Sequence, residues 1–99
     1  MGSNKYNQEE LQYVDNLLLT DGSIYTGQIK KGSKANKHGR GVQVWKDGAK
    51  YDGEWIEGKA NGKGIFYHVN GDIYEGEFSN DKANGQGTYY HKNGSKFIG

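Results

Sequence analysis

The sequence contains no cysteine, and it is poor in apolar residues. Of its 99 residues only 32% are hydrophobic. No apolar stretch is long enough to cross a bilayer or to form the apolar segment of a signal peptide. The absence of cysteine excludes disulfides and cysteine-ligated zinc, and it is typical of an intracellular protein. A chain of this length and composition predicts one small domain with a thin core.

Glycine and aromatic residues are abundant by contrast, with 17 glycines, eight tyrosines and two tryptophans. Because the formal net charge is only +1, this aromatic content argues against disorder. The first three residues, Met-Gly-Ser, are typical of a cloning scar, so we expect the chain to be part of a longer protein. Residues 7–19 are compatible with a short helix or with an irregular strand.

One pattern occurs three times along the chain. Residues 51–73 and 74–96 align without gaps and are identical at 12 of 23 positions. A third copy begins at Tyr25 and carries three extra residues before Gly39. Such self-similarity is typical of repeat architectures. The predicted division is an N-terminal extension of tag, short helix or coil (1–14) and an array (15–99) composed of a partial repeat (15–24), three repeats (25–50, 51–73, 74–96) and a partial repeat (97–99).

Each repeat contains an Asp-Gly or Asn-Gly pair, the strongest short-range signal for a β-hairpin. If Asn70-Gly71 forms a two-residue type I′ turn, Tyr67 lies opposite Tyr74. The same register places Val44 opposite Tyr51, and it places these aromatic residues on one face because side chains alternate along a strand. The glycine two residues after each tyrosine then leaves room on that face for the rings. The pairs are Asp21-Gly22, Asp47-Gly48, Asn70-Gly71 and Asn93-Gly94.

The predicted fold class is therefore all-β. We expect a single-layer, twisted antiparallel sheet of stacked hairpins that forms an open, solenoid-like rod. No helix of ordinary length fits residues 25–99. Because both ends of such a sheet expose an unpaired strand edge, self-association through these edges is a further prediction.

The repeated pattern resembles the MORN (membrane occupation and recognition nexus) motif. The second repeat matches fully, the third has Asp81 in place of one family glycine, and the first has Ile29 in place of the aromatic residue. The matching residues are Tyr51, Gly53, Trp55, Gly58, Gly62 and Gly64; Tyr74, Gly76, Phe78, Gly85 and Gly87; and Tyr25, Gly27, Gly32, Gly39 and Gly41.

The resemblance implies a docking role toward a protein or an anionic lipid. MORN arrays occur in lipid kinases, junctional membrane proteins, ciliary and cytoskeletal scaffolds, and beside methyltransferase domains. The resemblance therefore implies a cytoplasmic protein that is located near a membrane, the cytoskeleton or a cilium. A regulatory fragment of a larger protein, such as a phosphatidylinositol phosphate kinase, is one alternative that it leaves open.

A one-layer sheet leaves its aromatic face incompletely covered, which predicts a groove for another protein. Tyrosine and tryptophan suit such interfaces, and an amphipathic helix or a peptide is a familiar occupant. The alternative is that the rings only pack on one another. The predicted groove residues are Tyr25, Tyr51, Trp55, Tyr67, Tyr74, Phe78 and Tyr90.

Basic residues concentrate in the first repeat, which has a net charge of +6. They predict a site for anionic phospholipid or for an acidic partner, at about 1 kcal/mol per cation near a membrane surface; the alternative is a solvated loop. Nucleic acid is not an expected partner, because no basic face with interleaved aromatic residues covers the domain. The residues are Lys30, Lys31, Lys34, Lys37 and Arg40.

We expect no enzyme in this chain, and no catalytic, cofactor or metal site. Gly62-Lys63-Gly64 lacks the Ser or Thr and the helix of a phosphate loop. His68 and His91 occupy the same position in successive repeats without an evident third ligand. Acid–base catalysis needs one unique constellation, whereas a repeat supplies copies. A catalytic domain elsewhere in a longer parent protein remains an alternative.

Overall fold

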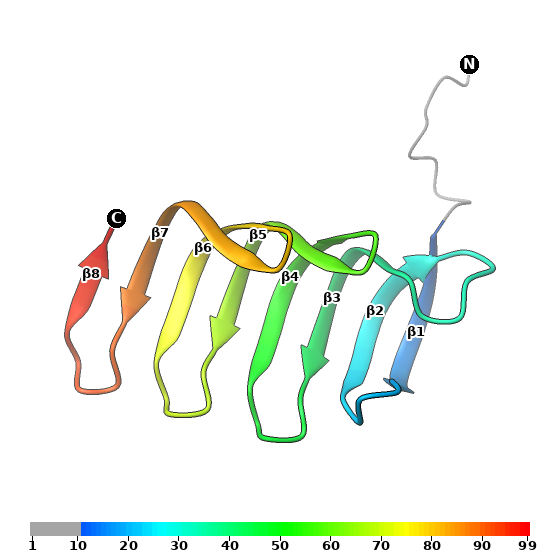
Figure 1. Cartoon of the computed structure of the whole chain (residues 1–99), viewed down its shortest axis with the longest axis horizontal. Helices are drawn as coiled ribbons and strands as arrows, with labels where there is room; N and C mark the ends of the chain where they lie inside the picture. The colour runs from blue at the N-terminus through cyan, green and yellow to red at the C-terminus, as the bar shows by residue number, and fades with distance from the viewer. Residues whose placement is uncertain (1–10) are drawn as a thin grey trace, which may run out of the picture.

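The chain forms one open antiparallel sheet in which every strand pairs with its neighbours in chain order (Figure 1). The computed structural model describes residues 11–99, which contain eight strands and no helix. The molecule is only 17 Å thick in its shortest dimension, as a single layer requires. The predicted fold class is confirmed. The strands are β1 (Leu11–Leu18), β2 (Ile24–Lys30), β3 (Lys37–Val44), β4 (Lys50–Ile56), β5 (Lys59–Tyr67), β6 (Ile73–Ser79), β7 (Lys82–Tyr90) and β8 (Lys96–Ile98).

The N-terminal strand β1 decides between the two interpretations of residues 7–19 for residues 11–18. It pairs with β2 from Leu11 onward, with an irregularity between Val14 and Leu17. Residues 11–14 are therefore strand, and the prediction that they form a helix or coil is wrong. The rest of the predicted extension, residues 1–10, lies outside the described residues.

The four Asp-Gly and Asn-Gly hairpin turns are each one residue longer than predicted. At the third, the Gly71 N–H donates to the His68 carbonyl at 3.0 Å, and the His68 N–H donates to the Asp72 carbonyl at 2.8 Å. The loop is thus three residues, a type I turn closed by a glycine with φ of +101°. Asn70 Oδ1 accepts the Asp72 N–H at 2.9 Å, which fixes the turn locally. The other three turns close with the same backbone pattern.

This extra residue shifts the register by one and reverses which residues share a face. Tyr74 lies opposite Phe66, not Tyr67, and Phe97 lies opposite Tyr89, not Tyr90. Tyr51 likewise lies opposite Gln43 and not Val44. Because side chains alternate, a shift of one residue moves a whole strand's side chains to the other face. Val44, Tyr67 and Tyr90 therefore lie on the face opposite Trp55, and the predicted register is wrong.

Two-residue type I′ turns are present, but at the opposite ends of the strands. Glu57 and Gly58 both have positive φ, and so do Asn80 and Asp81. Figure 1 shows these turns at one end of the strands, while the longer turns lie at the other end. Asp81 replaces the family glycine because aspartate tolerates a left-handed backbone. Its carboxylate also accepts the Ala60 N–H at 2.8 Å, which ties the third repeat to the second.

A row of paired glycines runs across the sheet under the tyrosine rings. Gly53 pairs with Gly64 across β4 and β5, and the same pairing continues into the neighbouring strands. A Cβ atom at Gly64 would lie only 2.3 Å from the Tyr51 hydroxyl oxygen, and one at Gly53 would lie 2.5 Å from the Gly64 Cα. The predicted role of glycine, to leave space for rings, is confirmed. The row consists of Gly27, Gly41, Gly53, Gly64, Gly76 and Gly87.

The other glycine of each Gly-x-Gly pair forms a bulge. The pairing of β4 with β5 shifts between Gly53 and Trp55, and Gly62 in the bulge has a φ of +99°. Glu54 folds over Gly62, and its Oε1 accepts the Lys63 N–H at 2.9 Å. Glu54 thus caps a backbone group that the bulge leaves unpaired in the ladder.

We predict that Gly64→Ala destabilises the fold by about 1–3 kcal/mol, because its Cβ would displace the Tyr51 ring from its packed position. Gly48→Ala is the control: its φ is unfavourable at +101°, which is not the case at Gly64, but the space around it is open. The smaller expected cost there is about 1 kcal/mol. Urea denaturation of the two variants measures the difference, and equal effects would contradict the packing of tyrosine on glycine.

Candidate functional site

The ring face, defined as the face that carries Tyr25, Tyr51, Trp55, Tyr74 and Phe78, contains a continuous chain of edge-to-face aromatic contacts. Trp55 lies between Tyr25 and Tyr51, with ring centroids 5.6 and 5.0 Å away. Phe78 lies between Tyr51 and Tyr74, at 4.8 and 5.2 Å. Each contact of this geometry contributes about 0.5–1.5 kcal/mol beyond area burial. The aromatic residue of the second and of the third repeat therefore covers the tyrosine of the repeat before it.

The tyrosine hydroxyls are satisfied by the backbone of their own strand. Tyr25 donates to the Gln28 carbonyl at 2.6 Å, and Tyr51 donates to the Glu54 carbonyl at 3.0 Å. Burial raises the pKa of Tyr51 to about 12, and burial also raises the pKa of Tyr25. These two rings are 0 and 1% exposed. They and Trp55 hold the sheet together and are inaccessible to a partner.

A second aromatic row lies on the ring face, beside the long turns. Trp45, Phe66, His68, Tyr89 and His91 contact one another in that order, with ring centroids 4.8–5.8 Å apart. Trp45, Phe66 and Tyr89 were not predicted to lie on this face, because the predicted register put them on the opposite one. The 23-residue spacing of His68 and His91 is visible in the sequence. Their common contact with Tyr89 could not be predicted, because it depends on the length of the turns.

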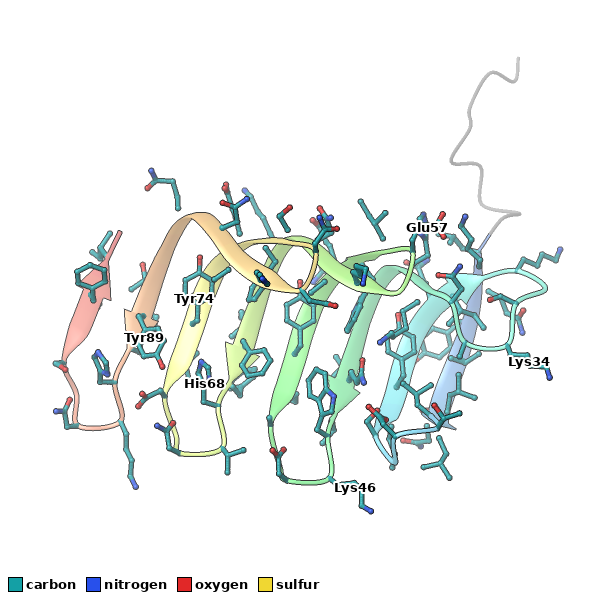
Figure 2. All side chains as sticks on the ribbon, in the orientation of Figure 1. Lys34, Lys46, Glu57, His68, Tyr74 and Tyr89 are labelled. Atoms are coloured by element: carbon teal, nitrogen blue, oxygen red, sulfur yellow. The ribbon has the colours of Figure 1, made fainter. Side chains whose placement is uncertain are left out.

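Ring burial declines toward the C-terminal end and leaves a hollow in the third repeat. Phe78 is 7% exposed, whereas Phe97 is 66% exposed. Within residues 11–99 no later aromatic residue covers Tyr74 as Phe78 covers Tyr51. The resulting third-repeat hollow has a volume of about 610 Å³ and is mainly apolar. Figure 2 shows Tyr74, Tyr89 and His68 over strands β5 to β7. The lining side chains include Phe66, Tyr74, Phe78, Asp81, Tyr89 and Phe97.

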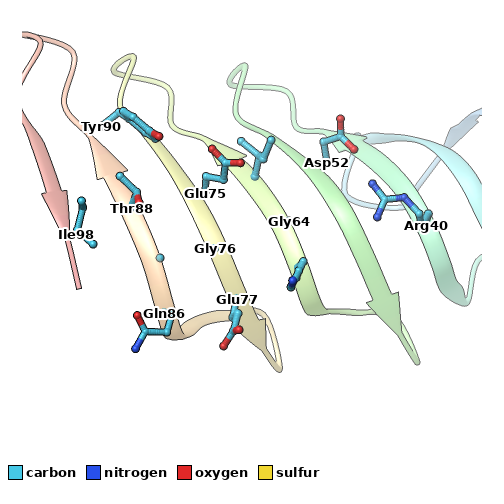
Figure 3. A pocket seen from close by; sticks show the side chains of 13 residues that line it. Arg40, Asp52, Gly64, Glu75, Gly76, Glu77, Gln86, Thr88, Tyr90 and Ile98 are labelled. Atoms are coloured by element: carbon cyan, nitrogen blue, oxygen red, sulfur yellow. The ribbon is translucent and has the colours of Figure 1, made fainter.

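The groove predicted from the sequence therefore divides into three groups. Tyr74 and Phe78 line the third-repeat hollow. Tyr25, Tyr51 and Trp55 lie on the same face but are buried. Tyr67 and Tyr90 lie on the reverse face, so their assignment to the groove is wrong. Tyr90 there lines a different hollow, of about 650 Å³, whose walls carry both acidic and basic side chains (Figure 3).

Lys37 is the basic residue that reaches the ring face. Its Nζ lies 4.4 Å from the centroid of the Trp55 ring and donates to Gln43 Oε1 at 2.7 Å. Burial lowers the pKa of Lys37, while the charges of Asp81 and Asp21 act in the opposite direction. Gln43 in turn donates to Ser23 Oγ at 2.8 Å. The ammonium group is thus held in place above a ring.

The remaining basic residues do not form one patch. Lys30 is paired with Glu57, whose pKa is lowered chiefly by that hydrogen bond. Arg40 pairs with Glu54 on the reverse face, with Nη1 and Oε2 3.9 Å apart. Lys31 and Lys34 are exposed in the loop between β2 and β3, where Figure 2 shows Lys34 pointing outward. Two of the five predicted residues therefore lie exposed together.

A side-chain cluster suited to metal binding is not found in the described part of the chain. No group of three or more His, Asp or Glu side chains is placed to hold a metal ion there. Within the same residues, no helix is long and apolar enough to cross a membrane. Glu54 is accounted for as a cap of the bulge, and Asp72 as an acceptor of the Lys92 N–H at 2.8 Å.

The hairpins, the paired glycines and the stacked rings define a class of repeat protein built from single-layer β-hairpin units. A comparison with protein families identifies the units: residues 25–50, 51–73 and 74–96 each match the MORN repeat. The chain belongs to the MORN repeat family. No curated protein matches the chain. MORN repeats are generally non-catalytic modules for interaction with proteins or membranes.

The buried tyrosines make alkaline titration a test of the ring face. Because the folded-state pKa of Tyr51 is raised to about 12, its contribution to stability is complete below the unfolded-state value of about 10. That contribution is lost as pH rises through the folded-state value. We expect the phenolate absorbance of Tyr51 and Tyr25 to appear only above the ordinary tyrosine value of about 10. Titration of all eight near pH 10 with the fold intact would contradict their burial.

Proposed function

We propose that the chain is a non-catalytic docking module that binds an amphipathic segment of another protein on the ring face, centred on the third-repeat hollow. The observation that carries the proposal is the decline of ring burial: Tyr25 and Tyr51 are sealed, whereas Tyr74 is half-buried beside the exposed ring of Phe97. Exposed aromatic side chains around a mainly apolar hollow are typical of interaction sites. The segment's apolar side chains fill the hollow, and its polar side faces solvent.

The buried rings have a different role in this proposal. Tyr25, Tyr51 and Trp55 position the floor of the site through the chain of ring contacts, but they do not touch the partner. Their substitution would therefore report on folding and not on binding. Tyr89 and Phe97, which the sequence analysis did not include in the groove, belong to the contact surface.

Adjacent tyrosines on opposite faces provide a matched test. We expect peptides selected from a random display library against the folded chain to lose about tenfold or more in affinity to Tyr89→Ala, because truncation of an aromatic hot-spot residue costs at least 1–2 kcal/mol. Tyr90→Ala, on the reverse face, is expected to leave affinity unchanged. Affinities are measured by titration calorimetry. Peptides that respond to Tyr90→Ala and not to Tyr89→Ala would contradict docking on the ring face.

A second candidate function, binding to anionic phospholipid, is supported by the exposure of Lys31 and Lys34 in one loop. Two cations near an anionic surface contribute about 2 kcal/mol. We expect weak sedimentation with phosphatidylserine or phosphoinositide vesicles at low salt, lost in the double variant Lys31→Glu, Lys34→Glu. A matched double variant of Lys46 and Lys92, which lie in the long turns, is the control. The absence of sedimentation at low salt would contradict this function.

A further inference from the structure

The reverse face of the sheet, opposite the ring face, carries most of the exposed large apolar side chains of residues 11–99. Leu18, Ile24, Val44 and Tyr90 are 39–69% exposed. They belong to one row of facing residues that crosses all eight strands, which we call the apolar row. An exposed apolar surface of this extent is typical of an interaction site. The row consists of Leu18, Ile24, Val44, Lys50, Tyr67, Ile73, Tyr90 and Lys96.

The next row, two residues away on each strand, contains two carboxylates separated by an apolar residue. Asp52 pairs with Ile65, and Ile65 pairs with Glu75. Figure 3 shows both carboxylates at the hollow of about 650 Å³ on this face. Among residues 11–99 neither carboxylate forms an ion pair; Arg40, which also lines the hollow, pairs with Glu54. Strands β4, β5 and β6 each have a neighbour on both sides, so the site is independent of both ends of the sheet.

The third row on this face has a cation where the second row has none. Lys63 pairs with Glu77, and on its other side the Glu54 carboxylate accepts the Lys63 N–H at 2.9 Å. A cation therefore lies between two acidic residues, and opposite charges on neighbouring strands stabilise a sheet. In the adjacent row the corresponding residue is Ile65, which carries no charge. The two carboxylates beside Ile65 therefore have no cation between them.

The two acids are also a departure from the repeat. Asp52 and Glu75 occupy the second position of the second and third repeats, whereas the first repeat has Thr26 at this position. Thr26 forms the same kind of strand pair, with Val42. The hairpin thus accepts a neutral residue here, and the fold itself does not require the carboxylates.

We propose that Asp52 and Glu75 bind one basic side chain of a protein partner, held over Ile65, at a second interaction surface distinct from the ring face. The backbones of β4 and β6 are two strand spacings apart, about 10 Å, so both carboxylates can reach one head group between them. Arginine fits best, because its planar guanidinium offers several N–H donors to carboxylates. Its aliphatic stem packs on the isoleucine while the charged head stays at the surface.

The apolar row supplies the second contact of this partner. Tyr67 and Ile73 face each other two residues along the strands from the proposed arginine site. An extended segment places alternate side chains on one face with the same spacing as the rows of the sheet. The partner is therefore an extended segment in which an apolar residue and an arginine are two residues apart.

The experiment uses two peptides that differ only in charge. N-acetyl-Ile-Thr-Arg-amide and its neutral isostere N-acetyl-Ile-Thr-citrulline-amide are titrated into the isotopically labelled chain at fixed ionic strength, and amide chemical shifts are recorded. We expect saturable shifts at Asp52, Ile65, Tyr67, Ile73 and Glu75 with the arginine peptide. The citrulline peptide is expected to bind about fivefold more weakly, which is the upper range for an exposed ion pair.

Two glutamates of β6 provide matched variants. Glu75→Gln removes one of the two proposed carboxylates and keeps the size of the side chain. Glu77→Gln makes the same change in net charge on the same strand and face, but beside Lys63. We expect Glu75→Gln to weaken binding of the arginine peptide about fivefold while leaving the citrulline peptide unchanged. Glu77→Gln is expected to change neither.

A third variant supplies the missing cation from within the chain. Ile65→Lys places a lysine between the two carboxylates, as Lys63 lies between Glu54 and Glu77. Because this lysine occupies the place of the partner's arginine, we expect the arginine peptide to bind at least fivefold more weakly. Urea denaturation checks that the variant is folded.

The outcomes also separate this surface from the one on the ring face. Equal binding of the two peptides, or no binding of the arginine peptide, overturns recognition of a basic side chain. Equal losses in Glu75→Gln and Glu77→Gln overturn the placement, because they indicate a general effect of charge. Shifts centred on Tyr74 and Tyr89 likewise overturn the site on the reverse face, and they leave docking on the ring face intact.

Discussion

The packing of a tyrosine ring on a pair of glycines is the contact on which the rest of the structure depends. Tyr51 lies over Gly53 and Gly64, whose backbones approach so closely that neither position has room for a Cβ atom. Trp55 and Phe78 contact the same ring in T-shaped geometry. Since the contact recurs in each repeat, a sheet only one layer thick obtains a core without a second layer.

The open hollow is a direct result of this arrangement. Tyr25 and Tyr51 are each covered by the aromatic residue of the next repeat and not by a residue of their own repeat. Tyr74 has only the contact with Phe78, and the space beside it exposes the rings of Phe97 and Tyr89. Tyr74 is therefore half-buried, whereas Tyr25 and Tyr51 are fully buried.

The sequence was sufficient for the fold class, the repeat and the role of the glycines, because these follow from patterns of residue type. It was insufficient for the face on which Tyr67 and Tyr90 lie. That outcome depended on one residue in the turn at Asn70-Gly71, a pair compatible with a two-residue and a three-residue loop. The position of Lys37 could not be predicted either, since nothing in a basic stretch of sequence indicates that the side chain of one of its lysines lies over Trp55.

The two kinds of turn impose different limits on changes in chain length. Deletion of one residue from a long turn such as that at Asn70 would exchange the inward and outward side chains of every strand that follows. The first repeat, in contrast, has three more residues between the paired Ile29 and Lys37 than the second has between the paired Trp55 and Ala60, and the glycine row continues across these strands unbroken. We therefore expect insertions and deletions in this architecture to accumulate at the strand ends that carry the turn at Glu57. They should be nearly absent from the opposite strand ends, which carry the long turns.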